Sequence, residues 1–178
     1  MSAVELNRFL MSVERRAFRM AQIAVRDVDE AMDIVQDTMM TLARKYGNKP
    51  ESEWKPLFYR ILQNRITDSH RRSTVKKRIF SIFRPSGDEE GLDPIESAPG
   101  MYADEPDFRL EMARTTERLE AAIAELPRRQ QQAFLLRTYD GMDVRDTARA
   151  MKCSQGSVKT HFSRAVHKLR EVLEDNES

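Results

Sequence analysis

The chain has 178 residues, 33% of them charged and 40% hydrophobic, and a formal net charge of +1. These values are typical of a soluble globular protein with one medium domain or two small ones. The single cysteine, Cys153, excludes an internal disulfide and fits a reducing compartment, and no segment approaches the ~18–20 apolar residues of a membrane span, so we expect a cytoplasmic protein without membrane insertion.

The first third of the chain predicts two amphipathic helices. Apolar residues recur at helical spacing from Phe9 to Met20 and again from Met32 to Tyr46. Acidic residues gather at the start of the second helix, and Arg44 and Lys45 stand at its end, which is the favourable order for the helix dipole. We expect Gly47 to end this helix.

A third helix is predicted from about Pro56, because proline is tolerated in a first turn but not in a helix interior. The helical periodicity ends near Ser73, so we place a first domain over residues 1–75. From Arg60 to Arg84 the charged residues are basic, with Asp68 as the only acid. Local charge therefore keeps nucleic acid among the possible partners, although the net charge is close to zero.

Residues 76–109 predict a linker between two domains. Prolines and glycines punctuate this segment, and from Pro85 to Phe108 it carries acids and no base. No alternation of β-branched residues predicts a strand anywhere in the chain. We therefore expect an all-α protein, with two small helical domains joined by a flexible acidic tether.

The second domain, residues 110–178, predicts a helix-turn-helix. A short helix "DVRDTARAM" begins at Asp143 as N-cap, and a longer helix begins at Ser154 as its cap. Lys152 stands where such turns usually carry glycine, so it must take a positive φ or reshape the turn. A short helix, a tight turn and a longer helix with a basic face form the plan of a DNA-reading motif.

The last helix is amphipathic. Its predicted inward face carries Val158, Phe162, Ala165, Leu169 and Val172. Its opposite face carries Gly156, Lys159, Thr160, Ser163, Arg164 and His167. These cations and hydroxyls suit phosphates and base edges, with Gly156 allowing close approach of the backbone. The alternative is a solvated basic face with no partner.

Three segments carry a family resemblance. "LPRRQQQAFLLRTYDGMDVRDTARAMKCSQGSVKTHFSRAVHKLRE" resembles the promoter-binding domain of bacterial RNA polymerase sigma factors, in the extracytoplasmic-function (ECF) group of the sigma-70 family. "DEAMDIVQDTMMTLAR" resembles the core-polymerase-binding helix, and "LFYRILQNRITDSHRR" the segment that melts and reads the minus-ten element. The resemblance implies a protein that binds core RNA polymerase, directs it to promoter DNA, promotes strand opening, and is restrained by an anti-sigma factor.

The resemblance also implies the site residues. It assigns core-polymerase binding to Asp33, Gln36, Asp37 and Met40. Contact with the melted minus-ten strand falls on Asn64, Arg65, Arg71 and Arg72. Contact with the minus-thirty-five duplex falls on Gly156, Lys159, Thr160, His161, Ser163 and Arg164.

Three alternatives remain open at this stage. The acids of the second helix can serve only the helix dipole, and Asp68 can pair with an arginine inside the fold. A tryptophan that often stands seven residues before the asparagine is Leu57 here, with Trp54 one turn earlier, so the aromatic residue that contacts melted DNA is not fixed.

Enzymatic functions are disfavoured, and two rival functions remain. The three histidines form no local metal cluster or catalytic triad, and there is no phosphate-binding glycine loop, so we expect neither catalysis nor a cofactor. One rival is a helix-turn-helix regulator that binds duplex DNA without polymerase. The other is a protein-interaction module, which would leave the basic helix face unexplained.

Overall fold

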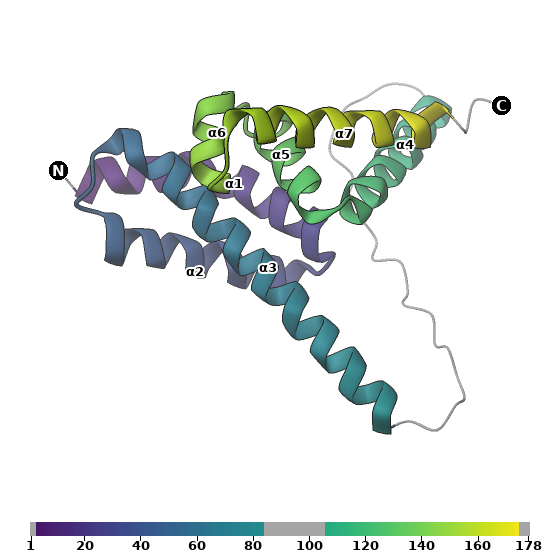
Figure 1. Ribbon diagram of the computed structural model, residues 1–178, viewed down its shortest axis with the longest axis horizontal. Coiled ribbons are helices and arrows are strands. Elements are labelled where there is room, and N and C mark those ends of the chain that lie inside the picture. Colours follow the sequence, from purple (N-terminus) through teal and green to yellow (C-terminus); the bar gives the residue numbers. More distant parts are fainter. Residues whose placement is uncertain (1–2, 84–105, 175–178) are drawn as a thin grey trace.

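The computed structural model describes residues 3–83 and 106–174, and the predicted all-α architecture is confirmed (Figure 1). The described residues form seven helices: α1 (Ala3–Val25), α2 (Val28–Tyr46), α3 (Glu51–Phe83), α4 (Pro106–Glu125), α5 (Arg128–Thr138), α6 (Val144–Met151) and α7 (Gln155–Glu174). We call α1–α3 the N-terminal body and α4–α7 the C-terminal body.

Helix α2 begins and ends where its sequence predicts, but Gly47 acts differently from expectation. The Asp27 carboxylate caps the helix by accepting a hydrogen bond of 2.8 Å from the Glu30 N–H. Gly47 has a right-handed φ of −57°, so the helix end needs no left-handed residue. A Cβ on Gly47 would instead lie 2.7 Å from the Ala43 carbonyl oxygen, so glycine is required here for space.

The core of the N-terminal body is aromatic. Trp54, Phe58 and Tyr59 of α3 are completely buried. The ring of Phe9 lies 5.7 Å from that of Trp54, and the Trp54 indole N–H donates a 3.2 Å hydrogen bond to the Tyr46 carbonyl. The indole ring therefore packs against another aromatic ring and its N–H has a hydrogen-bond acceptor, as a buried tryptophan requires.

Helix α3 is longer at both ends than its sequence predicts. It begins at Glu51, with Pro56 inside it, rather than near Pro56. It also continues to Phe83 instead of ending near Ser73, and at 1.5 Å per residue it is about 50 Å long. No proline or glycine follows Pro56 before Phe83, and the outer half of the helix shows no apolar period because its described side chains are exposed. Figure 1 shows this half projecting away from the other helices.

The predicted linker, residues 76–109, is therefore shorter than expected. Residues 76–83 belong to α3, and α4 begins at Pro106. Proline fits there because the first turn of a helix needs no donor from its backbone nitrogen. The remaining residues, 84–105, lie outside the described part of the chain.

The C-terminal body packs aliphatic rather than aromatic side chains. Leu135, Leu136, Val158 and Ala165 are completely buried. The Gln131 amide, also buried, donates a 3.0 Å hydrogen bond to the Ile123 carbonyl and so joins α5 to the end of α4. The two bodies lie against each other, with α1 packed on α4 and α3 packed on α6, and their buried side chains form one cluster.

Candidate nucleic-acid interface

The helix-turn-helix of α6 and α7 has the predicted caps. The Asp143 carboxylate accepts a 2.7 Å hydrogen bond from the Asp146 N–H, and the Ser154 hydroxyl accepts one of 3.0 Å from the Ser157 N–H. Lys152 takes the positive φ that its position predicts, with φ 50° and ψ 52°. The turn therefore keeps its geometry without glycine, at the cost of a left-handed lysine.

Helix α7 separates an inward face from an exposed one. Val158, Ala165 and Leu169 are buried and Phe162 is half-buried, whereas Val172, expected to face inward, is 40% exposed. Of the predicted duplex-contacting residues, five are exposed: Gly156, Lys159, Thr160, Ser163 and Arg164. His161 is half-buried, so its side chain is the least available of the set.

Burial lowers the pKa of His161, and the nearby charges of Arg129 and Arg164 lower it further. The imidazole is therefore neutral near pH 7 and has one nitrogen that can accept a hydrogen bond. The half-buried Phe162 stacks on Phe134 at 6.2 Å, and the guanidinium of Arg137 lies 5.8 Å from the Phe162 ring centre. These contacts fix the side of α7 that faces the body.

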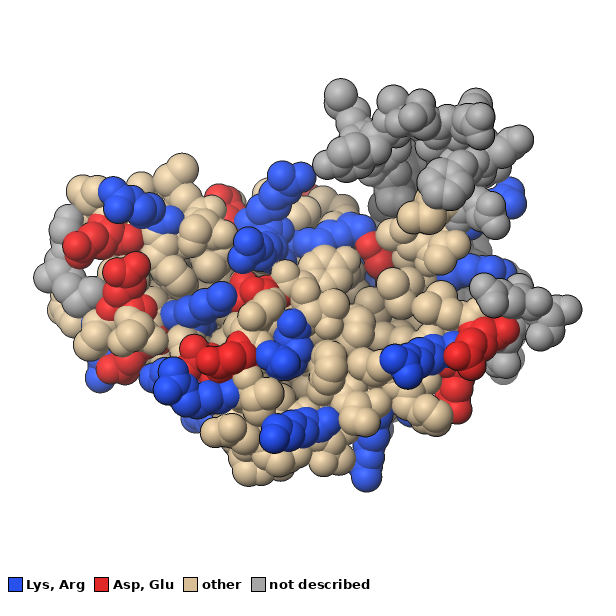
Figure 2. All heavy atoms as spheres, turned by 90° about the horizontal axis from the view of Figure 1, so that it is seen from above, with Lys and Arg blue, Asp and Glu red and all other residues tan. Residues whose placement is uncertain are grey.

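Four cations that line a surface depression extend the basic character beyond α7. They are Arg60 of α3, Arg145 and Arg149 of α6, and Lys152 of the turn. Figure 2 shows lysines and arginines scattered over the face that contains α6 and α7, with uncharged residues between them. Sequence reasoning missed Arg145 and Arg149, although their spacing of four in a short capped helix was a usable signal for two cations on one side.

In α3, the predicted strand-contacting residues differ in their availability. Asn64, Arg71 and Arg72 are exposed. Arg65 is only partly exposed, and its Nε lies 2.9 Å from the Asp37 carboxylate of α2. The complete burial of Trp54 and Phe58 leaves neither aromatic ring accessible to a base.

Asp68 is exposed, and in the described part of the chain no ion pair links it to an arginine. The alternative in which Asp68 pairs inside the fold is therefore wrong.

In α2, the predicted polymerase-contacting residues are not all free. Asp33, Gln36 and Met40 are exposed, with Met40 56% accessible. Asp37 was expected to be equally free but is half-buried and paired with Arg65. Met32, which sequence reasoning did not select, is 48% exposed, so Met32, Gln36 and Met40 form a strip at i, i+4 and i+8. An exposed strip with two methionines is a surface suited to a protein partner.

The described residues offer no other kind of site. They contain no group of three or more histidine, cysteine or acidic side chains that could hold a metal ion. Of the helices described, none combines the length and the apolar character that crossing a bilayer requires.

Comparison with known proteins identifies the family. The model of the family "Sigma-70, region 4" matches residues 116–169, which include the helix-turn-helix. The ECF RNA polymerase sigma factor EcfG of Rhodopseudomonas palustris is 29% identical over 148 residues, covering 83% of this chain and 73% of the relative. The RNA polymerase sigma-H factor of Pseudomonas aeruginosa is 26% identical over 156 residues, covering 84% and 76%.

The comparisons therefore support an ECF-type RNA polymerase sigma factor of the sigma-70 family, with residues 116–169 matching its region 4. A sigma factor directs transcription initiation by RNA polymerase and is not an enzyme.

Solved structures share the fold of this sigma factor. The sigma factor RpoE in complex with the anti-sigma factor NepR from Bartonella quintana has a TM-score of 0.74 at 22% identity, covering 96% of this chain and 97% of that one. CnrH in complex with the cytosolic domain of CnrY has a TM-score of 0.62 at 18% identity, covering 98% and 90%. The coverage of both bodies shows that the fold as a whole, and not only the helix-turn-helix, is that of a sigma factor.

Proposed function

We propose that the two bodies of this sigma factor read the two promoter elements separately. The C-terminal body would bind the minus-thirty-five duplex through α7, and the N-terminal body would bind the melted minus-ten strand through α3. The observation that carries the proposal is the capped helix-turn-helix with four exposed polar side chains and the exposed Gly156 along α7. A recognition helix enters the major groove with its N-terminal residues foremost, and these are the residues that α7 exposes there.

The first test separates base readout from phosphate contact on α7. We expect Arg164→Ala to relax specificity at one base pair and to cost about 1–3 kcal/mol on the preferred sequence, because arginine can bind guanine with two hydrogen bonds. We expect Lys159→Ala to weaken all sequences alike and to reduce the slope of log affinity against log salt by about one. Both are measured with polymerase holoenzyme and duplexes that carry single substitutions in the minus-thirty-five element.

Arg170→Ala is the matched control for these variants, because Arg170 is an exposed cation at the far end of the same helix. Its loss should change neither specificity nor affinity appreciably. If Arg164→Ala, like Lys159→Ala, weakened binding to all duplex sequences alike, base readout would have to be assigned to Thr160, His161 or Ser163 instead.

We propose that Asn64 reads an unstacked base of the melted strand, with Arg71 and Arg72 along its backbone. An exposed amide with exposed cations about two turns further along the same helix provides base-edge hydrogen bonding and charge neutralisation together, which single-strand binding needs. Asn64→Ala should slow initiation on duplex templates, and should slow it less on templates with a pre-melted bubble. An equal defect on both templates would contradict a role in strand opening.

We propose that the strip of Met32, Gln36 and Met40 binds core RNA polymerase, with Asp33 beside it. Asp37 would contribute through its ion pair with Arg65, which fixes α2 against α3. Gln36→Lys should weaken the binding of core polymerase without loss of helicity. Lys45→Gln is the control, because Lys45 is exposed on the same helix but nine residues further on, half a turn away around the axis.

We propose an anti-sigma factor as a further partner. The solved structure of RpoE, which is similar to 96% of this chain, is a complex with the anti-sigma factor NepR. Binding of such a partner should exclude core polymerase. The rival function, a regulator that binds DNA without polymerase, predicts unchanged promoter binding when core polymerase is omitted. Promoter binding measured with and without core polymerase, together with run-off transcription by core polymerase with and without this chain, separates these two functions.

A further inference from the structure

A buried carboxylate joins the two bodies. The Asp140 side chain, which follows α5, is completely inaccessible to solvent. Its Oδ2 lies 2.7 Å from the Lys55 ammonium and its Oδ1 lies 3.7 Å from the Arg16 guanidinium, while the Tyr59 hydroxyl donates a hydrogen bond to Oδ1. Asp140 belongs to the C-terminal body and all three partners belong to the N-terminal body. We call these four residues the interdomain ion cluster.

The interdomain ion cluster can stabilise only the state in which the bodies are in contact. Burying a carboxylate is costly unless opposite charges and donors surround it. Burial raises the pKa of the Tyr59 hydroxyl, and the Asp140 charge raises it further, so the phenol stays protonated and donates. When the bodies separate, Asp140 loses every one of these partners and returns to water.

Further contacts on either side of Asp140 show that this seam is extended. Arg60 of α3 donates a 2.6 Å hydrogen bond to the Arg149 carbonyl of α6, and Arg128 of α5 donates one of 2.7 Å to the Thr67 hydroxyl of α3. Arg19 of α1 pairs with Glu120 of α4.

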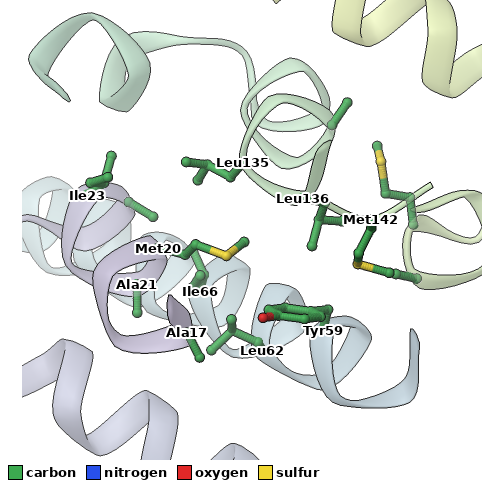
Figure 3. Close-up of a cluster of buried hydrophobic side chains, with 14 of the residues drawn as sticks. Ala17, Met20, Ala21, Ile23, Tyr59, Leu62, Ile66, Leu135, Leu136 and Met142 are labelled. Atoms are coloured by element: carbon green, nitrogen blue, oxygen red, sulfur yellow. The ribbon is translucent and has the colours of Figure 1, made fainter. Parts of the chain in front are cut away.

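Figure 3 shows the apolar part of the seam, where side chains from α1 and α3 face those from α5 and the segment after it. The labelled residues are Ala17, Met20, Ala21, Ile23, Tyr59, Leu62, Ile66, Leu135, Leu136 and Met142. The two bodies thus share apolar contacts as well as polar ones.

This arrangement is too compact for a sigma factor bound to a whole promoter. The names of the two elements place them about 25 base pairs apart, which is about 85 Å along the duplex at 3.4 Å per pair. Here α3 and α6, which belong to the two proposed DNA-reading bodies, are joined by a direct hydrogen bond. One molecule cannot occupy both elements while these helices remain in contact.

We infer that Asp140 holds the free sigma factor closed, and that this closure must be released before one molecule occupies both promoter elements. The consequence for promoter binding rests on the proposed function, whereas the closure concerns the chain alone. Arg60 of the N-terminal body lines the depression at the seam together with three cations of the C-terminal body, Arg145, Arg149 and Lys152, and the repulsion between Arg60 and these three opposes the closed state. Loss of the Asp140 charge should therefore shift the balance towards the open state.

The closure is tested on the full chain by small-angle X-ray scattering, without polymerase or DNA. Asp140→Lys places a third positive charge beside Lys55 and Arg16, and we expect the equilibrium constant for opening to rise about 100-fold or more. The radius of gyration should increase accordingly, while the helix content measured by circular dichroism stays unchanged. Asp140→Asn, which keeps the shape and one acceptor, should open the chain less.

Two further variants make this test specific. Asp146→Asn removes another half-buried carboxylate of the C-terminal body, whose ion-pair partners Arg145 and Arg149 lie in the same helix, and should leave the radius unchanged. Lys55→Asp combined with Asp140→Lys restores opposite charges and should restore much of the closure. A wild-type radius for Asp140→Lys, or an equal increase for Asp146→Asn, would overturn the inference.

A cross-link tests the consequence for transcription. Arg60 and Cys153, the only cysteine of the chain, line the same depression from the two bodies. A short bismaleimide on Arg60→Cys should therefore link them and fix the closed state. The linked protein should lose at least about tenfold in run-off transcription relative to the same variant left unlinked. Full activity of the linked protein would show that release is not required, whereas inactivity of the wild type would count against the proposed function and not against the closure.

Discussion

The N-terminal body buries Trp54, Phe58 and Tyr59 completely, whereas the described part of the C-terminal body buries no aromatic side chain completely. Its half-buried rings, Phe134 and Phe162, stack near the surface, and leucine, valine and alanine side chains fill its centre. Some of these aliphatic residues, including Leu135 and Leu136, face the N-terminal body. The comparison teaches that Trp54 and Phe58 form a core with Phe9 inside one body, whereas Tyr59, Leu135 and Leu136 lie at the contact between the two bodies.

The largest expected effect lies in the aromatic core. Trp54→Ala should lower the free energy of unfolding by about 3–5 kcal/mol, because the surrounding side chains cannot fill the volume of an indole. Leu135→Ala should cost less, in the lower part of about 2–5 kcal/mol. Both are measured by urea unfolding of the full chain, followed by circular dichroism. Leu173→Ala, at a position 38% exposed, is the control and should stay within about 0.5 kcal/mol.

A larger loss for Leu135→Ala than for Trp54→Ala would contradict the comparison. It would mean that the seam, rather than the aromatic core, dominates the stability of the molecule.

Helix caps provide the next effect, and here the two bodies should respond alike. Asp27 and Asp143 each accept a hydrogen bond from the backbone N–H three residues later, in α2 and α6 respectively. Replacement of either by alanine should cost about 1 kcal/mol. Replacement by asparagine, which can still accept that bond, should cost much less. Thermal unfolding of the four variants checks this, and a clear difference between the two bodies would show that one cap is supported by tertiary contacts.

Each body also carries one non-glycine residue in a left-handed conformation. These are Arg26 after α1, with φ 57°, and Lys152 after α6, with φ 50°. Lys152→Gly should raise stability by about 0.5–1 kcal/mol, because relief of the steric penalty exceeds the added entropy of the unfolded glycine. Arg26→Gly should act in the same direction. Lys152→Ala keeps the Cβ and is the control, so an equal gain from alanine would contradict strain as the cause.

The smallest expected effect concerns pH at the seam. Burial, and then the charge of Arg128, lower the pKa of His70 below its usual value of 6.5. The unfolded chain therefore binds a proton there more readily than the folded chain, and stability should fall as the pH drops through about 6.5. Thermal unfolding at pH 7.5 and pH 6.0 should show this loss. This loss of stability should become smaller in His70→Gln but not vanish, because His161, whose pKa is also lowered, still contributes. It should persist in full in His167→Gln, the control at an exposed position.

The local features of this chain could be predicted from its sequence because each depends on neighbouring residues. Asp143 and Ser154 stand directly before amphipathic runs, so their capping follows from spacing. The position of Lys152 between two such runs limits it to a positive φ or a reshaped turn, and it takes the positive φ. The inward stripe of α7 follows from the 3.6-residue period as far as Leu169, whereas Val172 is 40% exposed.

The features that remained unpredicted depend on tertiary contacts. Nothing around Asp140 in the sequence indicates a buried carboxylate, because its partners lie more than 80 residues earlier in the chain. Asp37 and Arg65 were assigned to two different surfaces, yet they form one ion pair between α2 and α3. The length of α3 was underestimated at its C-terminal end because residues 71–76 are exposed, and an exposed stretch of helix has no apolar period to reveal it.

The projecting half of α3 has a further consequence, which concerns the coupling of helix formation to binding. Arg72 and Lys76 lie four residues apart on its exposed surface, a spacing at which like charges destabilise a helix. Phosphate groups or added salt would weaken this repulsion, so the helix content of this half should rise on contact with a nucleic acid strand. Binding of the strand would then carry the thermodynamic signature of ordering, with a favourable enthalpy offset by a loss of chain entropy. Under the proposed function, the affinity of α3 for melted DNA would thus be coupled to its own helix–coil equilibrium.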